Sequence, residues 1–217
     1  MARQRLVLLL WGAVSCLWVL NLAQQLPDPN RILIVTVGGV FLADLGSYVF
    51  HYLVDHYGNP IPGGLVHEFQ RHHLIPQGIV EKPVLDVLYP GVRAVLPLMV
   101  LLYWPLQEGW LSITPALLLF VMMTCAAVGQ MCHRWAHTRA SCLVRVAQRL
   151  HLLVTPREHC EHHCHPFESR FAVITGWSNR PLDALGAPRL LDRVMYGLGF
   201  EKRGLVRSLG DISTPES

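Results

Sequence analysis

The segment LSITPALLLFVMMTCAAVGQM, residues 111–131, contains no charged side chain. A helix needs about 20 consecutive apolar residues to cross the hydrocarbon core of a bilayer. Within a bilayer, a helix satisfies its backbone hydrogen bonds inside one segment, which an irregular chain cannot do. We therefore predict a transmembrane helix at this segment, and the prediction restricts the chain to folds that suit a membrane.

Three further segments, residues 6–23, 32–54 and 87–104, have a similar apolar character. The whole chain is 52% hydrophobic and 15% charged, whereas an average soluble domain is about 25% charged. We predict an all-α polytopic membrane protein with about four transmembrane helices. A cleavable signal peptide is the alternative for the first segment, because signal peptides and uncleaved transmembrane helices both have an apolar amino-terminal segment preceded by arginine. Since its apolar run is long, we expect an uncleaved helix.

The arginines at positions 3 and 5 precede the first segment. The bias of positive charge toward the cytoplasm therefore places the amino terminus on that side. Two short turns follow, QQLPDPN at 24–30, with Asn30 as the expected helix cap, and PLQEGW at 105–110. Each hairpin returns the chain to the cytoplasm. We thus expect an integral protein of a bacterial inner membrane or the endoplasmic reticulum, with residues 55–86 and those after 131 on the cytoplasmic face.

All 12 histidines lie between His51 and His165. The predicted crossings place every one of them at or beyond the same membrane face. We therefore expect the four helices to carry a cytoplasm-facing, histidine-rich helical cap that holds the active site. The net charge is +3, and the chain has no long basic run or nucleic-acid motif, so we expect no nucleic-acid partner.

Two motifs place potential metal ligands four residues apart. HRWAH contains His133 and His137, and HYLVD contains His51 and Asp55 at the end of the second apolar segment. On a helix, this spacing directs both side chains to one face. An ionisable pair at a helix end near a membrane is a candidate functional site. The alternatives are a pair of interfacial histidines and a helix-end hydrogen bond.

Two other motifs hold histidines at closer spacing. HCEHH contains His159, His162 and His163, which we interpret as one metal-binding helix face with three imidazoles. FQRHH contains the neighbours His72 and His73. Adjacent helix positions are about 100° apart, so these two rings are able to serve different metal ions. The alternatives are a solvated polar helix and a surface pair.

Together the four motifs supply eight imidazoles and one carboxylate. A single zinc ion needs about four ligands, so eight imidazoles suit two ions. Imidazole binds iron, copper and zinc alike, and the spacing leaves the metal open. A membrane zinc hydrolase and a non-enzymatic metal-binding or haem-binding membrane protein are therefore alternatives to a redox enzyme. We do not expect the neighbouring Cys160 and Cys164 to be ligands.

The combined motifs resemble the Kua/CarF family of lipid desaturases. The likeness covers about residues 40–195 and rests on ADLGSYVFHYLVDHYG (43–58), FQRHHLIP (69–76), HRWAHT (133–138) and PREHCEHHCHPFESRFAVITGWSNRPLDALG (156–186). The family's characteristic histidines fall on His51, His72, His73, His133, His137, His159, His162 and His163. We expect one membrane-embedded domain over 1–217, with the first helix and turn at 1–30 and a tail at 196–217.

The resemblance implies a centre of two iron ions, dioxygen as co-substrate, and desaturation of a membrane lipid. Because the chain shows no haem, flavin or iron–sulfur motif, electrons would come from a donor such as cytochrome b5 or ferredoxin. The motif TGW (175–177) and His151 favour vinyl-ether formation in plasmanylethanolamine, which gives the plasmalogen plasmenylethanolamine. FQRHH and HCEHH favour the alternative, acyl desaturation of a phospholipid such as phosphatidylglycerol.

Other residues near these motifs have less definite predicted roles. Asp55 is a candidate ninth ligand, or a group that orients a ligating ring, and His151 is the other candidate ninth ligand. Glu161 is expected to lie just outside the ligands. Two arginines, Arg157 and Arg170, are candidates to bind a lipid phosphate. Trp177 and Asn179 are candidates for shaping the site, and ordinary packing is the alternative role for both.

Overall fold

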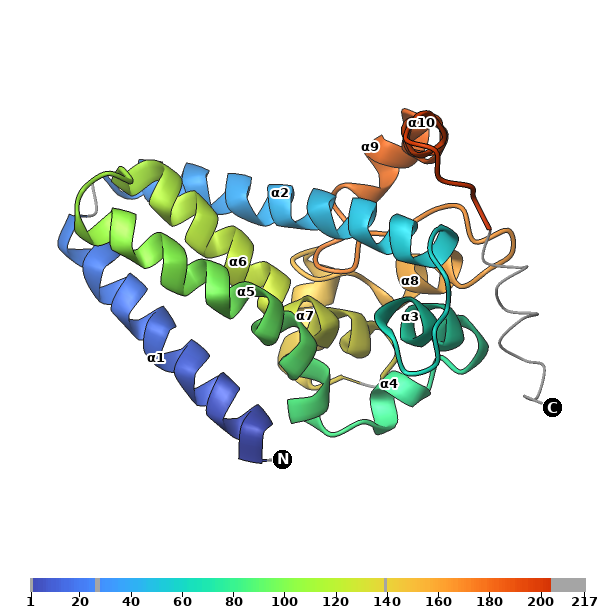
Figure 1. Ribbon diagram of the computed structural model, residues 1–217, viewed down its shortest axis with the longest axis horizontal. Helices are drawn as coiled ribbons and strands as arrows, with labels where there is room; N and C mark the ends of the chain where they lie inside the picture. Colours follow the sequence, from blue (N-terminus) through green and yellow to red (C-terminus); the bar gives the residue numbers. More distant parts are fainter. Residues whose placement is uncertain (1, 26–27, 139, 204–217) are drawn as a thin grey trace. The chain divides into compact units, whose positions relative to one another are not determined.

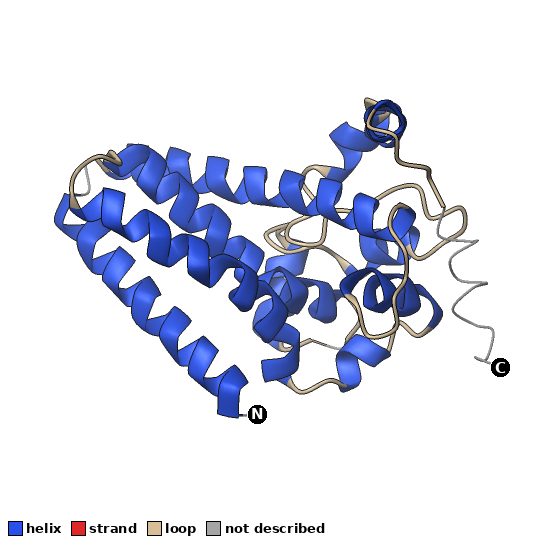
Figure 2. Ribbon diagram, viewed as in Figure 1, coloured by secondary structure: helices blue, strands red, loops and turns tan. Residues whose placement is uncertain are grey.

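A computed structural model describes residues 2–25, 28–138 and 140–203 of the chain. Throughout these ranges the regular structure is helical and contains no strand (Figure 2). The predicted all-α fold is thereby confirmed.

Four of the helices are long and apolar enough to cross a membrane: α1 (Ala2–Gln25), α2 (Pro29–His56), α5 (Val84–Gln107) and α6 (Ile113–Ala136). They confirm the four predicted transmembrane segments. The shorter helices are α3 (Leu65–Leu74), α4 (Gly78–Glu81), α7 (Cys142–Arg149), α8 (Pro156–His162), α9 (Asn179–Ala184) and α10 (Ala187–Gly197).

Contacts divide the chain into two compact units. Unit 1 comprises residues 1–43 and 82–131, and unit 2 comprises residues 44–81 and 132–217. Helices α2 and α6 begin in unit 1 and end in unit 2 (Figure 1). The expectation of a single functional domain over 1–217 stays a prediction.

In unit 1, helices α1 and α5 run in the same direction (Figure 1). The Trp18 side chain is fully buried; its indole N–H donates to the Met99 carbonyl at 3.0 Å, and its ring stacks on Phe120. Helix α5 approaches α6 closely at Gly91, where a Cβ atom would lie 2.6 Å from the Ala127 carbonyl oxygen. Glycine is therefore required there, as is common where membrane helices pack backbone to backbone.

The predicted cap of α2 is wrong, because Asp28 and not Asn30 caps the helix. The Asp28 carboxylate accepts the backbone N–H groups of Asn30 at 3.0 Å and Arg31 at 3.3 Å. Pro29 occupies the first helical position, where the proline ring suits the backbone and its missing N–H leaves no bond unmade. Asn30 is therefore already inside the first turn.

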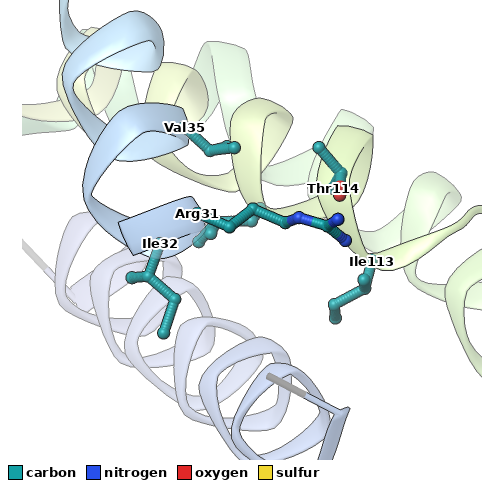
Figure 3. A pocket seen from close by; sticks show the side chains of 6 residues that line it. Arg31, Ile32, Val35, Ile113 and Thr114 are labelled. Carbon is teal, nitrogen blue, oxygen red and sulfur yellow. The ribbon is translucent and has the colours of Figure 1, made fainter. Parts of the chain in front are cut away.

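A small crevice lies between the first turns of α2 and α6. In Figure 3 the Arg31 side chain extends from α2 toward Thr114, beside Ile32, Val35 and Ile113. The lining is mainly apolar and includes none of the predicted site residues. This crevice therefore bears on the packing of unit 1 and not on the histidine motifs.

In unit 2, tyrosines of α2 hold the C-terminal helices. The Tyr48 hydroxyl donates to Asp183 of α9 at 2.7 Å, and the Tyr52 hydroxyl donates to Asp192 of α10 at 2.5 Å. Both rings pack edge-on against the buried ring of Phe171. Because Tyr48 and Tyr52 are four residues apart, one face of α2 fixes both helices.

The carboxylate of Asp44, also on α2, fixes a buried loop of unit 2. It accepts the backbone N–H groups of Thr175 at 2.8 Å, Gly176 at 3.0 Å and Ser178 at 2.9 Å. The Ser178 hydroxyl donates to the same carboxylate at 2.7 Å. Asp44 is fully buried. Four hydrogen bonds from one loop therefore compensate for removing this charge from water.

Replacing Asp44 by alanine should lower the free energy of unfolding by roughly 3–5 kcal/mol, because it leaves three buried N–H groups and a hydroxyl without an acceptor. Asparagine should cost less, since its oxygen still accepts while its NH2 group opposes the Ser178 N–H. Reversible unfolding in mixed micelles measures the difference. The control is alanine at half-buried Asp86 in α5, whose carboxylate accepts the Gln4 side chain at 2.7 Å, and it should cost about 1 kcal/mol. Equal losses at both positions would contradict the prediction.

Candidate metal centre

The structure gathers the nine predicted ligands into two groups, both in unit 2. Within each group, the potential ligand atoms all lie within 4.8 Å of one another. The five-histidine group consists of His72, His133, His137, His159 and His163. The aspartate group consists of His51, Asp55, His73 and His162.

Helix α3, which carries His72 and His73, is fastened to the end of α2. The buried Gln70 side chain donates from Nε2 to the carbonyls of Val54, at 3.2 Å, and Asp55, at 3.1 Å. These carbonyls belong to the last turn of α2, where no further helical N–H is available to them. The glutamine therefore satisfies the helix end and sets the position of the two adjacent histidines.

Helix α8, which carries His159 and His162, has a well-defined start. The Thr155 hydroxyl accepts the Glu158 N–H at 3.2 Å, and Pro156 occupies the first helical position. Both features favour a helix beginning at this point. Because α8 has only seven residues, its cap determines where each histidine points.

In the five-histidine group, four Nε2 atoms lie at hydrogen-bond distance from one another, but hydrogen bonds cannot satisfy all of these contacts at once. The Nε2 atom of His137 lies 2.9 Å from that of His72 and 2.7 Å from that of His159. The Nε2 atom of His159 also lies 3.1 Å from that of His163. A neutral ring nitrogen carries either one proton or one lone pair, so it cannot bond to two such partners. A cation bound between them would stabilise such converging nitrogen atoms.

In the aspartate group, three rings surround one carboxylate oxygen. Asp55 Oδ2 lies 3.4 Å from Nε2 of His51, 3.2 Å from that of His73 and 3.5 Å from that of His162. His51 donates from Nδ1 to the Phe171 carbonyl, at 2.9 Å. A carbonyl only accepts, so the neutral His51 ring carries its proton on Nδ1 and a lone pair on Nε2. That lone pair faces a carboxylate, an arrangement that a bound cation would stabilise.

The His162 ring has the same arrangement, because its Nδ1 lies 2.9 Å from the Ser169 carbonyl. A histidine that donates one ring N–H to a carbonyl and directs the other nitrogen to a shared centre is typical of metal ligands. Ligands bound to a first-row metal ion at about 2.1 Å lie roughly 3.4 Å apart, which matches the separations around Asp55. The donor set therefore fits metal ions, and the two groups can hold one each.

The structure divides the three imidazoles of HCEHH between the two groups. His159 and His163 belong to the five-histidine group, whereas His162 belongs to the aspartate group. At about 100° per residue, His163 is about 40° from His159 around the helix, but about 100° from His162. His72 and His73 also lie in different groups, as their adjacent positions suggested.

The residues with less definite predicted roles lie in several places. Asp55 is in the aspartate group, whereas His151 is exposed and in neither group. The Glu161 carboxylate lies 3.5 Å from Arg157 and 3.2 Å from Arg170, so both candidate phosphate-binding arginines are beside an acidic group. The cysteines at 160 and 164 are exposed.

Two further predicted residues fix loops. The buried Asn179 exchanges hydrogen bonds with the backbone of Ala172, and the Trp177 indole N–H donates to the His151 carbonyl at 2.5 Å. The roles of Asp44 and Gln70 were not predicted from the sequence. Asp44 has a recognisable signal, since an acidic residue inside an apolar span is rarely there without a partner.

Burial keeps the histidines outside the spans neutral. It is the main cause that lowers the pKa of His72 to about 2 and that of His137 to about 4, and neighbouring imidazoles lower both further. The pKa values of His159 and His163 are lowered for the same reasons. Neutral imidazoles are the form that binds metal ions.

The protein prepared without metal should become less stable on acidification below pH 6.5. An unfolded chain protonates these histidines near pH 6.5, whereas the folded chain does so only near the lowered values, so the unfolded state binds more protons. The free energy of unfolding should therefore fall between pH 6.5 and 4, by on the order of 1 kcal/mol per pH unit for each of His72 and His137. Unfolding measured across this range tests the slope. Replacing both residues by glutamine should reduce it, and an unchanged slope would contradict the assignment.

The family model described as the lipid desaturase domain matches residues 40–203, about three quarters of the chain. The chain belongs to the lipid desaturase family. This lipid desaturase family member is 32% identical over 168 residues to "Fatty acid desaturase 4, chloroplastic" of Arabidopsis thaliana, covering 73% of the chain and 50% of that relative. No solved structure matches.

The lipid desaturase family member is also similar to two plasmanylethanolamine desaturases. Identity is 28% over 187 residues to "Plasmanylethanolamine desaturase 1" of Mus musculus, covering 79% of the chain and 67% of the relative. Identity to "Plasmanylethanolamine desaturase" of Myxococcus xanthus is 29% over 154 residues, which cover 66% of the chain and 53% of that relative. The chain thus spans about half to two thirds of the length of these curated relatives.

Proposed function

We propose that this protein is an oxygen-dependent lipid desaturase in which each of the two ligand groups holds an iron ion. The observation that carries the proposal is the convergence of eight imidazole rings and one carboxylate in two adjoining sets. Membership of the lipid desaturase family supports it. The ligand number also favours two ions over one zinc ion, which takes about four protein ligands.

The proposed reaction removes two hydrogen atoms from adjacent carbons of a lipid chain. One dioxygen accepts them together with two protons and two electrons from a donor, so the products are a double bond and two water molecules. Two bound iron ions would supply the oxidation of unactivated C–H bonds, which side-chain acid–base groups cannot perform. The electron donor is of the cytochrome b5 or ferredoxin class.

The protein's own contribution is to hold neutral imidazoles in fixed orientations. The carbonyls of Phe171 and Ser169 accept the Nδ1–H groups of His51 and His162, which leaves both Nε2 atoms free to bind a metal ion. We infer that the two units work as one membrane-embedded domain. Its active site would face the cytoplasm, and the lipid would reach it from the bilayer.

The first candidate substrate is plasmanylethanolamine, in which a double bond beside the ether oxygen gives a vinyl ether. Relatives that carry this lipid in their names match the chain. Acyl desaturation of a phospholipid such as phosphatidylglycerol is the second candidate. It is favoured by the likeness to a fatty acid desaturase at 32% identity.

Expression of the protein in cells that lack vinyl-ether lipids, followed by lipid mass spectrometry, tests the proposal. New acid-labile vinyl ethers would establish the first substrate, and new acyl double bonds without vinyl ethers would establish the second. If protein that contains iron forms neither of these products, that result would contradict the proposed function. Metal analysis of purified protein should find about two irons per chain, whereas one zinc or a haem spectrum would support the alternatives.

The same assay tests an individual ligand. Replacing His162 by alanine should abolish the product, because one imidazole of the aspartate group is lost while its helix α8 is otherwise retained. Product at the level of the unchanged protein would remove His162 from the metal centre.

A further inference from the structure

A cleft of about 260 Å³ in unit 2 is separate from the two ligand groups. Its lining residues are His151, Glu158, Thr175, Gly176, Trp177 and Arg180. None of them belongs to either ligand group. Its volume is below the roughly 300–1,000 Å³ of pockets for drug-sized ligands, so it suits a small polar group.

The walls of this cleft are held in place from several sides. Asp44 fixes the backbone of the loop through Thr175 and Gly176, as described above. The Trp177 indole N–H bonds to the His151 carbonyl at 2.5 Å and so joins the two ends of the lining. A cleft with a rigid wall loses little conformational entropy when a ligand binds.

Gly176 leaves the Glu158 carboxylate uncovered. Its φ angle is +78°, in the left-handed region, and a Cβ atom there would lie 2.9 Å from Glu158 Oε2. Any larger residue would both strain the backbone and displace the carboxylate. The glycine therefore lets Glu158 contribute an acidic group to the cleft.

The cleft combines opposite charges that do not neutralise each other. Within the described ranges, neither Glu158 nor Arg180 forms an ion pair with another side chain. Glu158 lies in the same lining as an aromatic ring, and a carboxylate beside an indole suits an ammonium group. A guanidinium and an imidazole, as in Arg180 and His151, suit a phosphate.

We propose that this cleft binds the phosphoethanolamine headgroup of the lipid substrate, with the ammonium at Glu158 and Trp177 and the phosphate at Arg180 and His151. The inference rests on the proposed function and selects between its two candidate substrates. The headgroup of phosphatidylglycerol is a net anion without an ammonium, so it would bring no cation to Glu158. Glu158 directly precedes His159 of the five-histidine group, so α8 links headgroup binding to the metal centre.

Binding measured on protein prepared without iron tests this assignment. The probes are lyso-phosphatidylethanolamine and lyso-phosphatidylglycerol with the same acyl chain, quantified by native mass spectrometry. We expect the ethanolamine lipid to bind about tenfold more tightly, and Glu158→Gln to remove that preference, because one charge-assisted hydrogen bond is lost. Arg180→Gln should weaken the binding of both lysolipids to the same extent. The matched controls, Glu201→Gln and Arg189→Gln, change exposed residues outside the cleft and should leave both affinities unchanged.

A soluble competitor identifies the part of the lipid that is recognised. Glycerophosphoethanolamine has the headgroup without a tail and should displace the ethanolamine lipid, whereas glycerophosphoglycerol should not. Equal binding of the two lysolipids, a preference that survives Glu158→Gln, or no competition by the headgroup would each overturn the assignment. These results need no catalysis. Selective binding with no desaturated product from the iron-loaded protein would instead count against the proposed function alone.

Discussion

Replacing Asp55 by asparagine should remove one of the two metal ions and lower lipid desaturation by about 100-fold or more. Its carboxylate is the one anionic group in the two described groups, and its Oδ2 atom faces three imidazole Nε2 atoms at 3.2–3.5 Å. An amide of the same size is a weaker ligand and can present N–H groups to those nitrogens. Even the mutation of a group that only orients a ligand typically lowers metal affinity or activity by about 10–100-fold.

The measurements are iron per chain and product per unit of protein. Asp86→Asn is the matched control, because Asp86 is a half-buried carboxylate near the start of α5 that accepts the side chain of Gln4 at 2.7 Å. It should retain both irons and full activity. Two irons in Asp55→Asn together with lost product would mean that Asp55 acts on the reaction and not on metal binding. Two irons and full product would remove it from the centre.

The sequence was sufficient to predict the helices that are long and apolar enough to cross a membrane, because length and apolar character alone decide that property. It also identified nine residues that the structure clusters, and three pairs of them lie four apart in the sequence, a spacing that places two side chains on one helix face whatever the rest of the fold does. His133 and His137 illustrate this point. They retain their predicted relation although α6 ends between them at Ala136.

The division of the ligands between two groups could not be predicted with the same certainty. It depends on where α8 begins and ends, and the cap at Thr155 sets where it begins. A shift of one residue turns a side chain by about 100°, which is enough to move His162 from one group to the other. Helix ends are also where sequence patterns are least informative.

Contacts distant in sequence were outside the reach of any motif. The Phe171 carbonyl accepts the Nδ1–H of His51, 120 residues away, yet a carbonyl belongs to every residue and leaves no trace in the sequence. Likewise, the cleft between His151 and Arg180 exists because Asp44 bonds to a loop more than 130 residues away. Only the unusual position of Asp44 in an apolar span indicated a partner.

The neighbours His72 and His73 provide the sharpest test of two separate ions. His72 belongs to the five-histidine group and His73 to the aspartate group. We therefore expect His72→Ala and His73→Ala each to contain about one iron per chain, and the double variant to contain none. Both single variants should lose desaturation almost completely, since the oxidation of an unactivated C–H bond needs the intact centre. Iron analysis, with product measured on the same preparations, gives both readouts.

The control for this series is His67→Ala, which removes an imidazole from the same helix α3 but from neither group. It should keep both irons and the activity, so any loss in the other variants cannot be attributed to a disturbed α3. The pattern of iron content separates two arrangements. If all the histidines surrounded one shared ion, either single substitution would weaken the same site, and the double variant would add little. Two groups predict additive loss, one ion for each substitution, because adjacent residues on one helix direct their rings to different centres.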